Sequence, residues 1–251
     1  MTIRSNILTP KAVKGWVSHN SVLGTNAYDL DNLYSPDTAM RKACVLDLAP
    51  PKYNPHKKYW FDKSLKNNHG TITGGVFGST GWTLDGDDSL LIPNHASLSV
   101  DSDFTFLVWI KTTNTVGGFI ASFTNTPAVY GDGFAFGINL AGSGSGIMAA
   151  TCTGSSAWFF GTKAINDNSW HLVGLRLSGT TLDLLLDNTI DGTRVDSAPL
   201  PYTGNRRIGS NTAGTGNFLT GTIGQIWYYN AGLSDAVVAH IRNATKWRYT
   251  S

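Results

Sequence analysis

The chain has 251 residues and a formal net charge of +2, and all 17 of its acidic side chains are Asp. A near-neutral chain without a basic stripe interleaved with aromatic residues disfavours nucleic acid as a partner. No run of about 18 apolar residues is present that could cross a membrane. Charged residues make up 14% of the chain and Glu is absent, which favours strands and turns over helices.

The N-terminal region is the basic part of the chain. Residues 1–66 hold ten Lys and Arg side chains against five Asp, whereas residues 67–251 hold nine against twelve. Up to Met40 no regular periodicity is visible, apart from one helical turn expected from Ser35 as N-cap and Pro36 at the first position. Two interpretations remain open, a flexible tail with solvated lysines and an arm that docks on an acidic neighbouring subunit.

Large apolar side chains in this region favour docking, because a disordered tail seldom carries many of them. We therefore predict an extended arm over residues 1–42 and one folded domain over residues 43–251. The residues expected to carry the arm's contacts are Arg4, Lys11, Lys14, Trp16, Leu33, Tyr34, Arg41 and Lys42.

Residues 1–9 lack the charged and apolar segments of a secretory signal, so we expect synthesis in a cytoplasm without a signal peptide. Cys44 and Cys152 are far apart and have no metal-ligand spacing. They predict two buried thiols rather than a disulfide.

Short runs rich in β-branched and aromatic residues recur between turn clusters, which predicts strands. The predicted strands are residues 104–111, 118–123, 134–140, 147–153, 158–162, 170–177, 182–186 and 223–229. In 104–111 the even positions are all apolar and the odd ones are mixed. This pattern predicts one face in a core and the other only partly covered.

Small residues between the strands at 170–177 and 182–186 predict a hairpin turn. Asp187-Asn188 and Asp191-Gly192 tolerate the positive φ of further tight turns. Sequential strands are therefore expected to meander.

A series of motifs follows in order along the chain. Asp62, Ser64, Asn68 and Gly70 form a D-x-S-x-x-x-N-x-G turn after the strand-like run at 44–48. Further motifs lie at 82–86, 90–93, 104–110, 170–173, 184–188, 208–209, 218–223 and 229–234. The series resembles that of laminin-G-like, concanavalin A-type jelly-roll domains.

The resemblance implies an all-β fold of two packed antiparallel sheets, with an irregular N-terminal arm and a short C-terminal helix. Ser234 with Asp235 is suited to begin that helix, and Val237, Val238 and Ile241 give it an apolar side. The same fold hosts lectins, adhesins, hydrolases and capsid or tail parts, so it implies little about function.

Some members of the family bind calcium, which takes about six to eight oxygen ligands. The chain has Gln225 where the family often has an acidic residue, and Asn188 where its hairpin usually has Gly. A structural calcium ion is one interpretation, and turn-forming carboxylates are the alternative. The candidates are Asp85, Asp87, Asp88, Asp101 and Asp103.

The sequence offers no obvious pair of residues to act as the acid and the base of an enzyme. The glycoside hydrolases of this fold resemble each other in an E-x-D-x-x-E strand, and this chain has no Glu. Close Asp groups, such as Asp183 with Asp187, lie beside turns rather than in mid-strand, although a carboxylate pair could in principle serve. Motifs of other enzyme classes are absent. We expect no catalysis, and we interpret His171 as part of strand packing rather than as a general base.

Glycan binding combines an aromatic platform with carboxylate or amide hydrogen bonds. Tyr130, Asp132 and Trp158 are the candidate glycan-binding residues. The alternative is that Trp158 packs in the sandwich.

A lectin-type fold without an export signal fits bacteriophage virion proteins, which assemble in the cytoplasm and act outside after lysis. We therefore predict a non-catalytic virion surface protein, either a capsid decoration or a tail-associated subunit. It would bind virion subunits or copies of itself through the arm, and host glycans through the sandwich. The alternative is a free carbohydrate-binding lectin or adhesion module.

Overall fold

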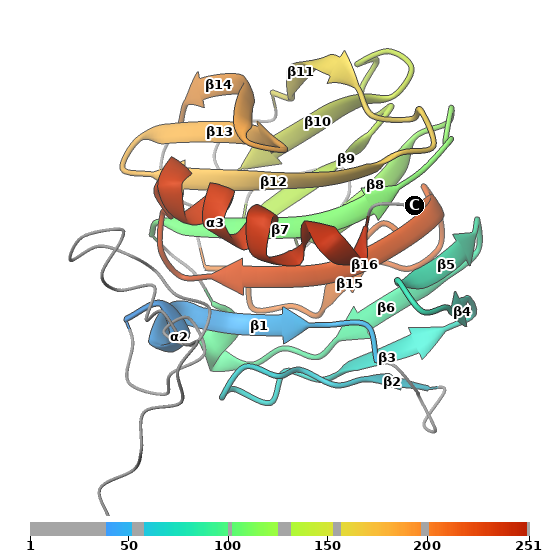
Figure 1. The fold of residues 1–251 in the computed structure, drawn as a ribbon, viewed down its shortest axis with the longest axis horizontal. Helices are drawn as coiled ribbons and strands as arrows, with labels where there is room; N and C mark the ends of the chain where they lie inside the picture. Colours follow the sequence, from blue (N-terminus) through green and yellow to red (C-terminus); the bar gives the residue numbers. More distant parts are fainter. Residues whose placement is uncertain are drawn as a thin grey trace, which may run out of the picture.

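The computed structural model describes residues 39–51, 58–99, 102–124, 132–152, 157–196 and 201–249. In this part of the chain two antiparallel β-sheets pack face to face, and helix α3 (Asp235–Thr245) lies across the outside of the first sheet (Figure 1). The predicted all-β, two-sheet jelly-roll sandwich with a short C-terminal helix is confirmed.

The first sheet has the strand order β14-β13-β12-β7-β16-β5-β4, and β1 also pairs with β16. β5 and β1 bind different halves of β16, because β5 pairs with residues 220–223 and β1 with residues 226–229. Its strands are β1 (Cys44–Leu48), β4 (Val76–Phe77), β5 (Trp82–Asp85), β7 (Phe104–Lys111), β12 (Trp170–Ser178), β13 (Thr181–Leu186), β14 (Thr189–Val195) and β16 (Thr220–Tyr229).

The second sheet has the order β11-β10-β9-β8-β15-β6-β3-β2. Its strands are β2 (Tyr59–Trp60), β3 (Gly70–Thr73), β6 (Ser89–Ile92), β8 (Gly118–Phe123), β9 (Phe134–Ile138), β10 (Ile147–Cys152), β11 (Phe159–Ala164) and β15 (Arg206–Ile208). The short helical elements are α2 (Ala39–Ala43) and the 3₁₀ turns η3 (Ala96–Leu98) and η4 (Lys246–Arg248).

Aromatic side chains fill the space between the sheets. Phe104 and Phe134 stack with ring centroids 5.0 Å apart, and Tyr228 lies 5.9 Å from Phe134. Each such ring removes a large apolar area from water, at roughly 25 cal/mol per Å². The core is therefore centred on β7, β9 and β16.

Strand β7 is buried on both faces. Its even positions face the core between the sheets, whereas Leu107 and Trp109 belong to a second apolar cluster beneath α3. The expectation that this second face is only partly covered is wrong, because α3 lies over it. The helix contributes Val237, Val238 and Ile241 to that cluster, and Ser234 caps it as predicted by accepting a hydrogen bond from the backbone N–H of Val237.

The predicted strands agree closely with the structure. β7 and β8 have the predicted bounds, and the predicted hairpin is confirmed by the pairing of β12 with β13 around Gly179, whose φ is 60°. The expected meander holds within β12-β13-β14 and within β8-β9-β10-β11. It fails between β7 and β8, which belong to different sheets, as a jelly roll requires.

The two predicted turns after β13 have different outcomes. Asp187 adopts a positive φ of 54°, as expected. Asp191-Gly192 forms no turn and lies within β14. The Asp191 carboxylate instead accepts hydrogen bonds from the backbone N–H groups of Thr162 (3.1 Å) and Lys163 (3.4 Å) in β11, so it links the two sheets.

Cys44 and Cys152 are free and buried, which confirms the prediction. Burial raises the pKa of the Cys44 thiol and so keeps it protonated and unreactive. Among the described residues, none of the helices has both the length and the apolar character needed to span a membrane.

One buried carboxylate organises the D-x-S-x-x-x-N-x-G turn. Asp62 Oδ1 accepts hydrogen bonds from the backbone N–H groups of Asp47 and Ser64, both at 2.8 Å. Asp62 Oδ2 accepts from Ser64 Oγ at 2.6 Å and from the backbone N–H of Asn68 at 2.8 Å. Asn68 Nδ2 then donates to Val45 O at 2.6 Å. The motif therefore fastens the turn to β1 through charge-assisted hydrogen bonds.

Replacing Asp62 with Ala is expected to lower the free energy of unfolding by roughly 3 kcal/mol, because several buried donors lose their acceptor. Urea denaturation followed by Trp fluorescence measures the change. Leu65, an exposed neighbour, supplies the control, and Leu65→Ala should alter stability by less than about 0.5 kcal/mol. A loss below about 1 kcal/mol for Asp62→Ala would contradict this role.

Candidate functional site

A groove opens beside β2, the edge strand of the second sheet. Its volume is about 590 Å³, within the range of roughly 300–1,000 Å³ that is usual for ligand pockets. Its size therefore suits a small polar ligand such as one or two sugar rings. The residues that give it its chemical character are Tyr59, Phe61, Asn67, His69, Asn94 and His95.

The aromatic wall of this groove follows from the alternation of side chains around β2. Trp60 is 1% exposed and points into the core, so its neighbours Tyr59 and Phe61, each 46% exposed, point outward. Trp60 Nε1 donates to Ala49 O at 2.9 Å, which holds this short strand in place. The rings of Tyr59 and Phe61 lie 6.4 Å apart at 37°. Two exposed aromatic rings thus stand side by side on a fixed backbone.

Polar groups with defined donor and acceptor roles border the aromatic wall. His69 Nδ1 accepts a hydrogen bond from the backbone N–H of Asp62 at 3.0 Å, so the proton of the neutral imidazole lies on Nε2, which becomes a donor. The His69 ring meets Phe61 edge-on, with centroids 5.2 Å apart. Asn94 Oδ1 accepts from the buried Arg206 at 2.6 Å, which orients the Nδ2 of Asn94 as a donor.

This combination suits recognition of a hydroxylated ligand. Aromatic faces pack against the C–H groups of a sugar ring, and amide and imidazole donors bind its hydroxyls. Among the described residues that line the groove, none is a carboxylate. The groove therefore offers binding groups without an acid and base pair for hydrolysis.

Two of the glycan-binding residues predicted from the sequence, Asp132 and Trp158, do not line this groove. Asp132 accepts a hydrogen bond from Thr124 Oγ1 at 3.4 Å, and Trp158 packs on Phe119 with ring centroids 6.2 Å apart. Tyr130 lies outside the described residues, so the predicted trio stays a prediction. Sequence reasoning missed Tyr59 and Phe61, although three consecutive aromatic residues, which a strand divides between its two faces, were a usable signal.

The acidic cluster predicted for calcium is brought together in part. One carboxylate oxygen from each of Asp85, Asp87 and Asp88 lies within 4.8 Å of the others. Burial, helped by the charges of Asp85 and Asp87, raises the pKa of Asp88, whose Oδ2 accepts from the backbone N–H of Asp85 at 2.8 Å. Asp103 also accepts a backbone hydrogen bond at 2.8 Å, and Asp101 lies outside the described residues. The contact of Asp88 with Asp85 fits a turn-forming carboxylate, whereas Asp103 accepts from the backbone N–H of Gly179 in the β12–β13 turn, and a calcium site stays a prediction.

Carboxylates near β12 tie the strands to α3. Asp187 lies 3.1 Å from His171 Nδ1 and accepts from Arg242 Nε at 3.1 Å. The hydrogen bond with Asp187 raises the pKa of His171. Asp183 pairs with the buried Arg176 at 2.7 Å. Asp183 and Asp187 are thus both held by basic partners, and Asp187 links His171 of β12 to Arg242 of α3.

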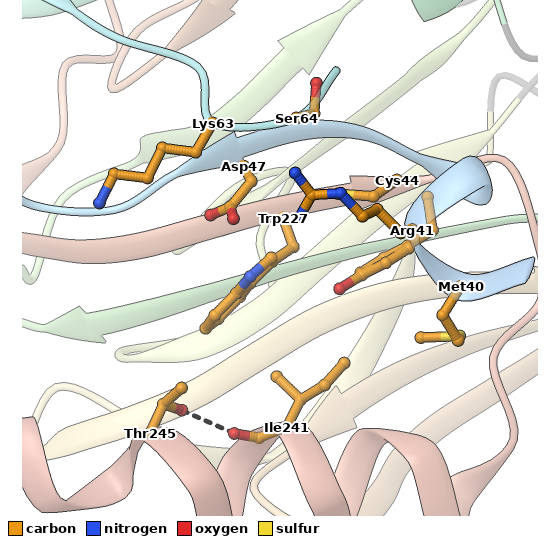
Figure 2. A pocket seen from close by; sticks show the side chains of 10 residues that line it. Met40, Arg41, Cys44, Asp47, Lys63, Ser64, Trp227, Ile241 and Thr245 are labelled. Atoms are coloured by element: carbon orange, nitrogen blue, oxygen red, sulfur yellow. Dashed lines mark hydrogen bonds between the residues drawn. The ribbon is translucent and has the colours of Figure 1, made fainter. Parts of the chain in front are cut away.

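A smaller cavity lies between α2, β1 and α3 (Figure 2). Its volume of about 30 Å³ suits water-sized molecules only. Asp47 lines it, is 5% exposed, and accepts a hydrogen bond from Gln225 Nε2 at 2.7 Å. Burial raises the pKa of Asp47 to about 6. The cavity is too small for a sugar, but it holds a carboxylate whose ionised form is costly in this environment.

Two of the predicted arm residues lie in helix α2. Arg41 is half-buried and lines the small cavity, whereas Lys42 is exposed. Met40 packs against the apolar cluster beneath α3. The other predicted arm residues, Arg4, Lys11, Lys14, Trp16, Leu33 and Tyr34, lie outside the described residues.

Residues 84–239 match the family described as the concanavalin A-like lectin/glucanases superfamily, of laminin G type. Because this match covers more than half of the chain, the chain belongs to that superfamily. A search of curated protein sequences finds no significant match.

Solved structures share the fold at low sequence identity. One is the binding domain of botulinum neurotoxin DC in complex with SialylT, with a TM-score of 0.60, 13% identity, and coverage of 81% of this chain and 52% of that chain. The receptor-binding domain of the botulinum neurotoxin C/D mosaic serotype has a TM-score of 0.62 at 11% identity, with coverage of 82% and 52%. A third structure is of botulinum neurotoxin type C, whose cell entry depends on interaction with two ganglioside molecules. Its TM-score is 0.58 at 12% identity, with coverage of 81% of this chain and 51% of that chain.

The chain therefore spans about half the length of these similar structures. At such identity the likeness shows the fold alone. None of these comparisons supports the virion role.

The buried Asp47 predicts an unusual pH dependence of stability. Because the pKa of Asp47 lies above its ordinary value of 3.8, the folded protein binds this proton more tightly than the unfolded chain does, and it loses stability as the pH rises from about 4 to about 6. Asp47→Asn removes this titration. Relative to the wild type, the variant should gain about 2 kcal/mol in free energy of unfolding between about pH 4 and about pH 7.5. Urea denaturation of both proteins at both pH values checks this. The prediction is contradicted if the difference in free energy of unfolding between variant and wild type is the same at the two pH values.

Proposed function

We propose that the chain is a non-catalytic carbohydrate-binding domain, and that the groove beside β2 is its binding site. The observation that carries this proposal is the pair of exposed rings, Tyr59 and Phe61, on the wall of a groove bordered by amide and imidazole donors. Membership of a lectin and glucanase superfamily supports it.

The exposure of the two rings has a physical cost that binding would offset. A large aromatic side chain gains about 1.5–3 kcal/mol from burial, and Tyr59 and Phe61 forgo about half of this gain. A sugar ring that packs on them removes the apolar surface from water, while its hydroxyls keep hydrogen bonds to His69 and Asn94. Tyr59 lies in the edge strand β2, which pairs with β3, and Phe61 directly follows it, so little backbone entropy is lost on binding.

The absence of catalysis is part of the proposal. Glu is absent from the chain, and Asp183 and Asp187, which are near each other in the sequence, are engaged by Arg176, His171 and Arg242. A glycosidase needs two carboxyl groups about 5–10 Å apart on either side of the scissile bond. The proposed groove has no carboxylate among its described lining residues.

The names of the similar structures agree with a binding role. The botulinum neurotoxin domains are described with SialylT and with gangliosides, and those ligands belong to those proteins. Since the chain spans about half of each, glycan binding enters here only as a proposal for this chain.

Binding can be tested by screening the full chain on a glycan array and measuring the best saccharide by calorimetry. Tyr59→Ala and Phe61→Ala should each weaken binding roughly tenfold. Val195→Ala removes a side chain that is 80% exposed on the far edge strand β14, and it should bind as the wild type does. The saccharide should be recovered intact after incubation. Wild-type affinity in both aromatic variants, or cleavage of the saccharide, would refute the proposal.

Attachment to a virion or another subunit through the arm stays a prediction from the sequence. The structure refines its test, because Met40 packs against the domain's own apolar cluster. Deleting residues 1–38 rather than 1–42 preserves this contact. The shortened protein should keep the thermal stability of the full chain and fail to enter particles. Full incorporation of the shortened protein would contradict an anchoring arm.

A further inference from the structure

A second groove of similar size lies at the C-terminal end of the chain. Its volume is about 530 Å³. It is lined by residues from four segments, namely the one after β1, the β2–β3 connection, the β4–β5 turn and the tail after α3: Pro50, Lys63, Thr80, Trp247, Arg248 and Tyr249. Trp247 is 67% exposed, an unusual position for the largest apolar side chain.

The exposed indole is held in place. Trp247 Nε1 donates to Ala244 O at 2.9 Å, and the Arg248 guanidinium lies 5.0 Å from its ring centroid in a cation–π contact. The next residue anchors the tail, because the Tyr249 ring stacks on Trp109 with centroids 4.6 Å apart. The Tyr249 hydroxyl also accepts from the backbone N–H of Gln225 at 2.8 Å. Trp247 is therefore a fixed platform.

A buried chain of hydrogen bonds ends at the same place. Asp47 Oδ1 accepts from Gln225 Nε2 at 2.7 Å, and Gln225 Oε1 accepts from Arg248 Nη1 at 3.0 Å. Gln225 is 2% exposed, so the carboxylate fixes which way its amide points. A buried carboxylate lowers stability when ionised. The carboxylate of Asp47 nevertheless orients Arg248 at the surface, through Gln225. A loss of stability of this kind is typical of functional sites.

The groove is positively charged. Lys63 and Arg248 both line it, and no carboxylate occurs among its described lining residues. Among the described residues, neither cation forms an ion pair with an acidic side chain. One Arg248 N–H is used by Gln225, and the rest of the planar guanidinium is suited to bind a carboxylate or sulfate group.

We propose that this groove binds the anionic group of an acidic saccharide, with a sugar ring on Trp247 and the carboxylate or sulfate on Arg248 and Lys63. Asp47 and Gln225 are positioning residues for Arg248. The hydroxyl of Thr80 can hydrogen-bond to sugar hydroxyls. A peptide is the less suitable ligand, because peptides are commonly held by an open strand edge, and the residues around Thr80 belong to a turn. The proposal does not depend on the groove beside β2.

Calorimetry with sialyllactose, sulfated lactose and lactose tests the proposal on the full chain. The wild type should bind at least one of the two acidic sugars about tenfold more tightly than lactose, and the two distinguish carboxylate from sulfate recognition. Trp247→Ala and Arg248→Gln change exposed side chains and should each remove about tenfold of that affinity. Affinity for the acidic sugar should fall as salt is raised.

Control variants separate the two grooves. Tyr59→Ala should leave the affinity for the acidic sugar intact, and Arg248→Gln should leave any lactose binding intact. Gln225→Met should weaken acidic-sugar binding while lactose binding is unchanged, which a general loss of folding would not produce.

Three results would overturn the proposal: equal affinity for acidic and neutral sugars, wild-type affinity in both Trp247→Ala and Arg248→Gln, or binding of an acidic peptide more tightly than either acidic sugar. None of them bears on the neutral-sugar test of the groove beside β2.

Discussion

The burial of β7 on both faces is the constraint from which the rest of the architecture follows. One face closes the core between the sheets, and the other requires a cover, which α3 and the C-terminal tail supply. Polar contacts fix that cover: Thr105 Oγ1 donates to Ala231 O at 2.8 Å, and Trp109 Nε1 donates to Thr245 Oγ1 at 3.0 Å. Because the helix is fixed at both ends, the residues after it reach the surface at one defined place beside β1.

The sequence predicted those parts of the fold that depend on local patterns. The strand at 104–111 alternates, and Ser234 with the apolar residues at 237, 238 and 241 marks a capped helix. The full burial of β7 was beyond such reasoning, because Thr105, Leu107 and Trp109 form a mixed face that fits partial cover equally well. Asp191-Gly192 has the composition of a turn. The Asp191 carboxylate instead accepts a backbone hydrogen bond from β11, about thirty residues away in the sequence.

The candidate sites were less accessible to sequence reasoning than the fold. Tyr59 and Phe61 flank Trp60, and only the structure tells which of three adjacent aromatic residues enters the core. The contact between Asp47 and Gln225 joins residues 178 positions apart, whereas in the sequence alone Gln225 indicates only the loss of a family carboxylate. The D-x-S-x-x-x-N-x-G turn was recognised from its residues, whereas its hydrogen-bonded role required coordinates.

The link between β11 and β14 has a consequence for aggregation. These are edge strands of the two sheets, and exposed edges invite pairing with other chains. Asp191 of β14 occupies backbone donors of β11, and it approaches so closely that a Cβ at Gly161 would lie 2.1 Å from its Oδ2. On the opposite side the edge strands β2 and β4 have two residues each, too few to template a ladder. In the described part of the chain, geometry rather than surface charge thus limits pairing at these four edge strands.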